Sequence, residues 1–232
     1  MKNAGLVIAL FDLDGTLCNA RHLAASIIGY QFKHPTRIPR VVIYLITQAA
    51  RLLLLKLGLL TYAGVVQASS RPFARLLKGL GASEASDLFS KAARTVVGTA
   101  REEMLTLIKW HQEQGHAVIV VSGGFQPFLI EVARLLGTNR TVGTALEVVD
   151  DCYTGRLAGP FCHGNDRVHL VRHFIEVSGL DVDLSSSYAY GDRVQDIPML
   201  EMVGHPVAAY PEKKLLSYAN QKGWNVIGAP RR

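Results

Sequence analysis

The chain has 232 residues, of which 49% are hydrophobic, so it can bury a sizeable core in one or two domains. Its three cysteines, Cys18, Cys152 and Cys162, form neither a CxxC pair nor an even set, which excludes a readable zinc site and favours a reducing compartment. The formal charge of +6 and the isoelectric point near 9.3 favour anionic partners such as phosphorylated substrates, acidic membranes or nucleic acid.

The first predicted element is a buried strand that ends in two carboxylates. An apolar run over residues 7–11 is followed by Asp12 and Asp14 and then by a Gly-Thr turn. A short apolar run of this kind fits a parallel strand, and open α/β sheets bind ligands at the carboxyl ends of their strands. Two carboxylates this close repel each other unless positive charge lies between them. The alternative is an Asp-rich turn that caps a helix.

Residues 19–98 show helical patterns and no strand pattern, so we expect a helical insertion after the first strand. Its most apolar stretch, 38–60, is interrupted by Arg51 and Lys56, which argues against a membrane-spanning helix. We favour a helix buried in a bundle, because such helices are commoner. The other interpretation is an interfacial helix that enters lipid while nearby cations meet the head groups. Those cations are Lys33, Arg37, Arg40, Arg51 and Lys56.

The rest of the chain alternates between helix and strand patterns. The expected helices are 101–114, 126–136, 167–177 and 212–221, and the expected strands are 116–121, 187–190, 207–210 and 224–227. Residues 146–149 and 153–157 are expected to form a hairpin that turns at Asp150 and Asp151. Such alternation predicts a mostly parallel, doubly wound sheet.

Two of these strands end in residues that suit ions. The strand at 116–121 runs into Ser122 and Gly123, whose hydroxyl and backbone N–H groups suit an anion, although a plain glycine turn is the alternative. The strand at 187–190 runs into Asp192, and Asp196 follows four residues later. Four carboxylates at two strand ends suit a hard cation such as Mg²⁺.

The two acidic motifs resemble those of the haloacid dehalogenase superfamily, in its phosphoserine-phosphatase-like branch. Residues 11–17 read FDLDGTL, and residues 191–200 read GDRVQDIPML. Between them the family expects a Ser or Thr and then a Lys or Arg, and Ser122 and Arg167 follow in that order. Arg167 stands where the family usually has Lys. Its guanidinium group carries the same positive charge as the ammonium group of Lys but has a different shape. A surface Arg at the start of a helix is the alternative.

The resemblance implies a fold and a reaction. The fold is a Rossmann-like α/β core, residues 1–18 and 99–232, with a small helical cap, residues 19–98. The reaction is Mg²⁺-dependent hydrolysis of a phosphomonoester through an aspartyl-phosphate. A cap of this kind covers the site and excludes water.

The resemblance also implies the role of each site residue. Asp12 is the nucleophile, and Asp14 is first the acid and then the base. Mg²⁺ is held by Asp12, by the main-chain carbonyl of Asp14 and by Asp192, with Asp196 orienting the groups around it. The phosphate oxygens are held by Ser122, the N–H of Gly123 and Arg167.

The substrate is less constrained than the reaction. Phosphoserine phosphatases carry a Glu nine residues after the nucleophile to bind the substrate's ammonium group, whereas this chain has Arg21 there. We therefore expect a more anionic substrate than phosphoserine. A small soluble phosphomonoester remains open, as does a lipid phosphate such as phosphatidylglycerophosphate with peripheral contact to the inner face of an anionic membrane. A non-catalytic basic binding module is a further alternative, but no nucleic-acid motif is present and no nucleic-acid partner is expected.

Overall fold

A computed structural model describes residues 5–18 and 22–230. Its centre is a six-stranded sheet with the order β3-β2-β1-β6-β7-β8, in which every neighbouring pair is parallel. The strands are β1 (Ile8–Asp12), β2 (Ala117–Phe125), β3 (Arg140–Thr144), β6 (Tyr188–Gly191), β7 (His205–Ala209) and β8 (Asn225–Ile227). This topology confirms the doubly wound α/β fold.

β1 lies at the point where the strand order reverses, with β2 on one side and β6 on the other. Asp12 pairs in register with Val121, and Phe11 pairs with Tyr190. The carboxyl ends of all three strands therefore meet at one edge. In open α/β sheets this reversal leaves a crevice at the strand ends, which is the usual place for a ligand.

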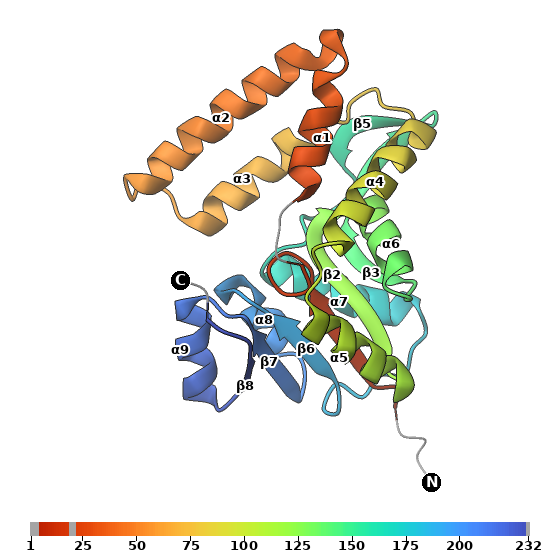
Figure 1. Cartoon of the computed structure of the whole chain (residues 1–232), viewed down its shortest axis with the longest axis vertical. Coiled ribbons are helices and arrows are strands. Elements are labelled where there is room, and N and C mark those ends of the chain that lie inside the picture. The colour runs from red at the N-terminus through yellow and green to blue at the C-terminus, as the bar shows by residue number, and fades with distance from the viewer. Residues whose placement is uncertain (1–4, 19–21, 231–232) are drawn as a thin grey trace.

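Helices cover both faces of the sheet (Figure 1). They are α5 (Glu102–Glu113), α6 (Gln126–Leu135), α7 (Asn165–Val177), α8 (Ile197–Leu200) and α9 (Lys213–Lys222). Alternate residues of β1 point to opposite faces, so Ala9 and Phe11 join the cluster that contains α5 and α6 side chains. Ile8 and Leu10 join the cluster with α7, α8 and α9. Burial on both faces explains why β1 is apolar throughout until Asp12.

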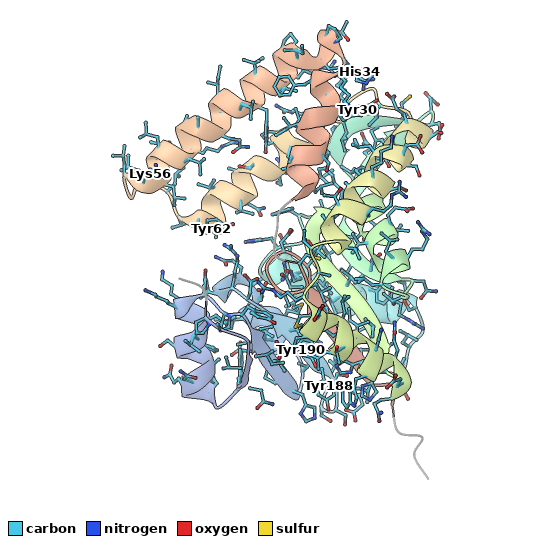
Figure 2. The ribbon with its side chains drawn as sticks, in the orientation of Figure 1. Tyr30, His34, Lys56, Tyr62, Tyr188 and Tyr190 are labelled. Atoms are coloured by element: carbon cyan, nitrogen blue, oxygen red, sulfur yellow. The ribbon has the colours of Figure 1, made fainter. Side chains whose placement is uncertain are left out.

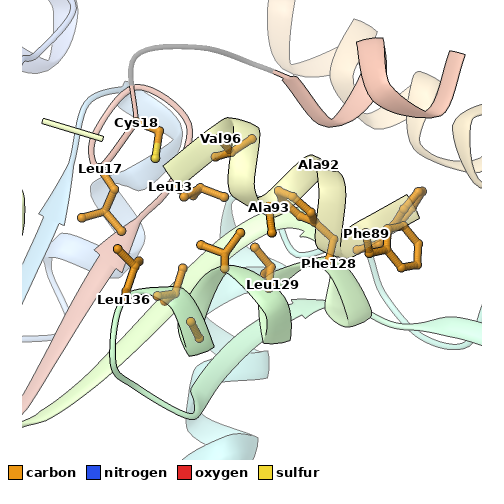
Figure 3. Close-up of a cluster of buried hydrophobic side chains, with 14 of the residues drawn as sticks. Leu13, Leu17, Cys18, Phe89, Ala92, Ala93, Val96, Phe128, Leu129 and Leu136 are labelled. Carbon is orange, nitrogen blue, oxygen red and sulfur yellow. The ribbon is translucent and has the colours of Figure 1, made fainter. Parts of the chain in front are cut away.

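The insertion after β1 consists of helices, as expected. They are α1 (His22–Phe32), α2 (Ile38–Lys56), α3 (Tyr62–Arg75) and α4 (Ala82–Val97), with a short 3₁₀ turn at Pro35–Arg37. α4 packs against α6, and Figure 3 shows Phe89 of α4 and Phe128 of α6 in one buried cluster. Burying one such ring stabilises the fold by about 1.5–3 kcal/mol. The insertion is thus anchored on the sheet layer, while its division from the core at residues 18 and 99 stays a prediction.

A small hairpin supports the insertion from the core side. β4 (Leu146–Val149) and β5 (Cys152–Leu157) pair antiparallel around Asp150 and Asp151, whose φ angles of 49° and 59° make the tight turn that the sequence predicted. β5 packs against the end of α3, where the Gly79 N–H donates to the carbonyl of Tyr153 at 2.8 Å. At Gly155 a Cβ would come within 2.9 Å of Lys78, so this contact requires glycine.

The interpretation of 38–60 as a buried helix is wrong. Val41 is the buried residue of α2, and Ile43 and Ile46 are 66% and 65% exposed. α2 lies on the outer side of the insertion, with α1 and α3 between it and the sheet (Figure 1). Judged by length and composition only, the helical stretch Pro35–Lys56 is long and apolar enough to cross a membrane.

Other differences concern strand and helix limits. β3 was not predicted, and it pairs with β2 at the sheet edge. β2 continues through Ser122 as far as Phe125, with an irregular register after Val121. α7 begins at Asn165, two residues before the expected start.

Candidate active site

A cavity of about 420 Å³ lies between the carboxyl edge of the sheet and helices α1, α2 and α3. Its sheet side is formed by the strand ends of β1, β2 and β6, the start of α7 and the turn after β6. Its helical side is formed by α1, α2 and α3, and Tyr62 lies at the start of α3 (Figure 2). The sheet edge and the helical insertion therefore line one cavity that is open on one side.

Three buried carboxylates meet on the sheet side. Asp12, Asp192 and Asp196 are 5%, 1% and 3% exposed, and each offers an oxygen within 4.8 Å of the other two. They converge because β1 and β6 are neighbouring parallel strands that end at the same edge. Asp14, half-buried, lines the same cavity. Gly15, with φ of 107°, makes the turn that brings Asp14 back to it.

Arg167 lies among these carboxylates. It is 4% exposed, its Nη2 is 3.1 Å from Asp12 Oδ1, and its Nη1 donates to Asp196 Oδ1. The other oxygen of Asp196 accepts the backbone N–H groups of Asp192 at 3.0 Å and Arg193 at 2.9 Å. Asp196 thus holds both Arg167 and the turn that carries Asp192. At Gly191 a Cβ would come within 2.6 Å of Asp196, so this arrangement requires glycine.

Ser122 and Gly123 form the neighbouring wall. Ser122 is 1% exposed, and its Oγ accepts the N–H of Gly124 at 3.0 Å. The carbonyl of Gly123 accepts the hydroxyl of Thr144 on β3 at 2.9 Å, so β3 holds this loop in place. Phe161 covers Gly123 closely enough that a Cβ there would lie 3.1 Å from the ring. Ser122 and Gly123 consequently line the same cavity as Asp12.

Carboxylates outnumber cations among the described residues of the site. Burial raises the pKa of Asp12, the charge of Asp196 raises it further, and Arg167 opposes both. For Arg167, burial acts to lower the pKa, but the carboxylates of Asp196 and Asp12 raise it above its usual range. Among the described residues that line the cavity, four carboxylates face two guanidinium groups. An ionised Asp12 therefore needs further positive charge, and buried carboxylate oxygens at this spacing fit Mg²⁺.

Seven of the eight residues predicted from the sequence come together around this cavity. They are Asp12, Asp14, Ser122, Gly123, Arg167, Asp192 and Asp196. The eighth, Arg21, lies outside the described residues.

The sequence analysis missed the residues that form the helical wall and the mouth. Tyr44, Gln48 and Leu52 of α2 line the cavity at a spacing of four residues, a helical stripe that could have been recognised. At the mouth, the guanidinium of Arg193 lies 4.9 Å from the centre of the Tyr62 ring and links the core to α3. The remaining missed lining residues are Leu23, Ala24, Val65, Val66, Ser69, Ser70, Phe73, Gly124, Phe125, Phe161, His163 and Gln195.

His163, just before α7, also lines the cavity. Burial lowers the pKa of its imidazole, and the nearby charge of Arg167 adds to this effect. The ring is therefore neutral at pH 7, and it stacks on Phe161 with ring centres 5.5 Å apart.

Comparison with known proteins agrees with this geometry. Residues 9–201 match the family model described as haloacid dehalogenase-like hydrolase. A phosphoserine phosphatase of Mycobacterium tuberculosis is 29% identical over 94% of this chain and 69% of its own length. A Bordetella pertussis structure of unknown function superposes with a TM-score of 0.81 at 24% identity, covering 97% of this chain and 99% of that one. A phosphoserine phosphatase structure with a phospho-aspartyl intermediate analogue gives a TM-score of 0.62 at 23% identity, covering 99% and 95%.

Proposed function

The chain belongs to the haloacid dehalogenase-like hydrolase family, and from this premise we propose that it is a Mg²⁺-dependent phosphomonoester hydrolase that acts through an aspartyl-phosphate. One observation carries the proposal. Asp12 lies buried at the strand-order reversal, in contact with Arg167 and beside Asp192, with Ser122 on the adjacent strand. This is a nucleophile, a cation site and an anion site in one cavity.

The residues would divide the reaction as follows. A carboxylate oxygen of Asp12 attacks phosphorus, and the bond from phosphorus to the leaving oxygen breaks as Asp14 donates its proton to that oxygen. Asp14 then removes a proton from a water that attacks the phosphoaspartate and returns Asp12 as a carboxylate. Arg167, Ser122 and the N–H of Gly123 hold the non-bridging oxygens throughout.

Mg²⁺ would be held by Asp12, by the main-chain carbonyl of Asp14 and by Asp192, with Asp196 either as a further ligand or as the group that orients Arg167. Mg²⁺ held there would supply the positive charge that keeps Asp12 ionised and that offsets the charge of the phosphoryl group. The atoms that these residues offer to the ion are all oxygen atoms, which are the donors that Mg²⁺ prefers.

The test is Mg²⁺-dependent phosphate release from an aryl phosphate by wild type and Asp12→Asn. We expect turnover by the wild type only, because the amide is not a nucleophile at this position. Asp87→Asn, which removes an exposed carboxylate on α4, is the matched control and should keep full activity. Wild-type turnover by Asp12→Asn would exclude the mechanism. Absence of turnover by the wild type on any phosphomonoester would favour the non-catalytic binding module.

A second, narrower candidate is that the phosphate group is carried by an amphiphilic or lipid molecule. The helical wall of the cavity favours it, because Leu52, Val66 and Phe73 offer apolar contacts there. Among the described residues of this wall, none is acidic, so the ammonium group of phosphoserine would find no carboxylate on it.

This candidate is tested with phosphoserine, glycerol phosphate and a monoalkyl phosphate kept below its micelle concentration. We expect the alkyl phosphate to give the highest kcat/KM, and Val66→Asn to lower that value while sparing the aryl phosphate. Ile130→Asn, at a half-exposed position on α6 that does not line the cavity, is the control. A preference for phosphoserine would reject the amphiphilic substrate and leave the phosphatase proposal intact.

A further inference from the structure

The outer face of α2 is the most conspicuous apolar surface of the described chain. We define it as Val42, Ile43, Leu45, Ile46, Leu53, Leu54 and Leu57, which are between 38% and 66% exposed. Steps of three, four and seven residues place most of them on one side of the helix. Single exposed apolar side chains need no explanation, but a contiguous stripe along a whole helix marks an interaction surface.

The chain segment that carries this face has charged side chains of one sign, although Glu84 of α4 lies 3.8 Å from Arg37 just before the helix. Between Asp14 and Glu84 the sequence has no acidic residue and nine Lys or Arg residues. All 19 acidic residues therefore lie elsewhere, together with the other 16 of the 25 basic residues. A strongly cationic segment with an exposed apolar face is complementary to a surface that is apolar inside and anionic outside.

We propose that the outer face of α2 docks this protein on an anionic lipid surface. The helix, about 28 Å long from its 19 residues, lies in the plane of the surface with Ile43, Ile46 and Leu53 inserted. Lys33 before the helix and Lys56 at its end, both exposed, meet the anionic head groups. Figure 2 shows Lys56 at the outer end of α2.

The inner face of α2 explains why the helix lies on the membrane and does not span it. Tyr44, Gln48 and Leu52 line the cavity that holds Asp12. The hydroxyl of Ser69 on α3 donates to Gln48 Oε1 at 2.7 Å, and Val41 is fully buried against its neighbours. Insertion across a bilayer would remove one wall of the cavity and place Gln48 in hydrocarbon, where an unpaired amide is costly.

A second copy of the chain is a less suitable occupant. In a symmetric dimer the same surface meets itself, so two segments without a single carboxylate between residues 15 and 83 would be brought together. Like charges at such an interface repel each other, whereas anionic head groups neutralise them.

The docking goes beyond the proposed catalytic function and does not depend on it. It is tested by co-sedimentation of the full chain with vesicles of equal parts phosphatidylcholine and phosphatidylglycerol, compared with vesicles of phosphatidylcholine alone. We expect binding to the anionic vesicles and at least tenfold weaker binding to the neutral ones. Added salt should weaken the anionic component, because charge attraction is screened within about 10 Å at 0.1 M.

Two sets of variants separate the apolar and the ionic contributions. Replacing Ile43, Ile46 and Leu53 together by Ser should lower vesicle binding more than tenfold. The matched control replaces Ile130, Val149 and Val177 by Ser. These three residues lie outside the helical insertion and have similar exposed fractions (51%, 52% and 68%), so this variant should bind vesicles as the wild type does. Lys33→Gln and Lys56→Gln should each lower binding about five-fold, since a basic residue near an anionic surface contributes about 1 kcal/mol. Lys213→Gln and Lys214→Gln, on α9, are the controls.

Several results would overturn the docking. One is a wild-type protein that stays in the supernatant with anionic vesicles at low salt. Another is an equal loss of binding by the control triple variant. A third is a lipid-free dimer, seen by sedimentation equilibrium, that the Ile43, Ile46 and Leu53 variant converts to monomer, because the face would then be a self-association surface. Asp12→Asn should bind vesicles normally, so failure of the catalytic proposal is distinguishable from failure of this one.

Discussion

Replacing Arg167 tests the electrostatics of the site most directly. The guanidinium is 4% exposed and contacts Asp12 at 3.1 Å and Asp196. Arg167→Ala leaves the buried carboxylates of Asp12 and Asp196 without their shared cation, and removing one partner of a buried pair costs about 3–5 kcal/mol. Arg167→Lys keeps the positive charge but cannot contact Asp12 and Asp196 through two separate nitrogens. We therefore expect the free energy of unfolding to fall by about 1–2 kcal/mol, comparable to one charge-assisted hydrogen bond. The same order, wild type above Lys and Lys far above Ala, is expected for phosphatase turnover.

The assay is urea unfolding at pH 7 followed by circular dichroism. Arg134→Ala is the matched control, because Arg134 pairs with Glu131 at 3.2 Å while its side chain is 62% exposed, and such surface pairs contribute about 0–1 kcal/mol. Mg²⁺ should restore part of the stability of Arg167→Ala, since it supplies positive charge to the same carboxylates. Equal stability and activity of the Ala and Lys variants would refute the reasoning and would move phosphate binding elsewhere, for example to Arg193.

Three further predictions concern the core and the site. Burial lowers the pKa of His111 to about 4, and the adjacent His116 adds to this; its ring nitrogens lie 2.8 Å from His116 and from the Tyr190 hydroxyl. Because the pKa of histidine in the unfolded chain is about 6.5, the free energy of unfolding should fall by up to about 3 kcal/mol as the pH drops from 6.5 towards 4. In chemical denaturation across that range, the free energy of unfolding of His111→Gln should depend less on pH than that of the wild type. An unchanged pH dependence would rule out His111 as the cause. Gly191→Ala should destabilise the fold and abolish turnover, because its Cβ would meet Asp196 at 2.6 Å, whereas Gly159→Ala, with open space around the Cβ, should change neither; a fully active Gly191→Ala enzyme would show that the turn tolerates displacement. Beryllofluoride with Mg²⁺ should raise the Tm of the wild type but not of Asp12→Asn, since it mimics a phosphoaspartate and stabilises the state that binds it; no shift with the wild type would argue against a covalent intermediate.

The sequence located the sheet edge and most of the site because both depend on local patterns. Apolar runs that stop at Asp12, Ser122 and Asp192 mark buried strands with polar ends, and parallel strands bring those ends together. The turn at Gly15 and the one after Gly191 could be predicted for the same reason. β3 could not, because Arg140–Thr144 is short and mixes polar residues with one valine, and its pairing with β2 becomes evident only in three dimensions.

The position of α2 could not be predicted because an apolar helix reveals nothing about its neighbours. Composition alone suits a buried helix and an interfacial one equally, and only the packing of α1 and α3 shows that Ile43 and Ile46 face outward. The helical wall of the cavity was missed for a related reason. The stripe of Tyr44, Gln48 and Leu52 is visible in the sequence, but what it faces depends on how the insertion folds back over the sheet.

The central claim is that Asp12 carries the phosphoryl group. The direct measurement is mass spectrometry of peptides after rapid acid quench of a reaction with Mg²⁺ and an aryl phosphate, using Asp14→Asn to slow hydrolysis of the intermediate. The account predicts a phosphoryl group on the peptide that contains Asp12, lost when Asp12→Asn is added to the same background. Turnover without a phosphorylated peptide, or a phosphoryl group on any other residue, would contradict it.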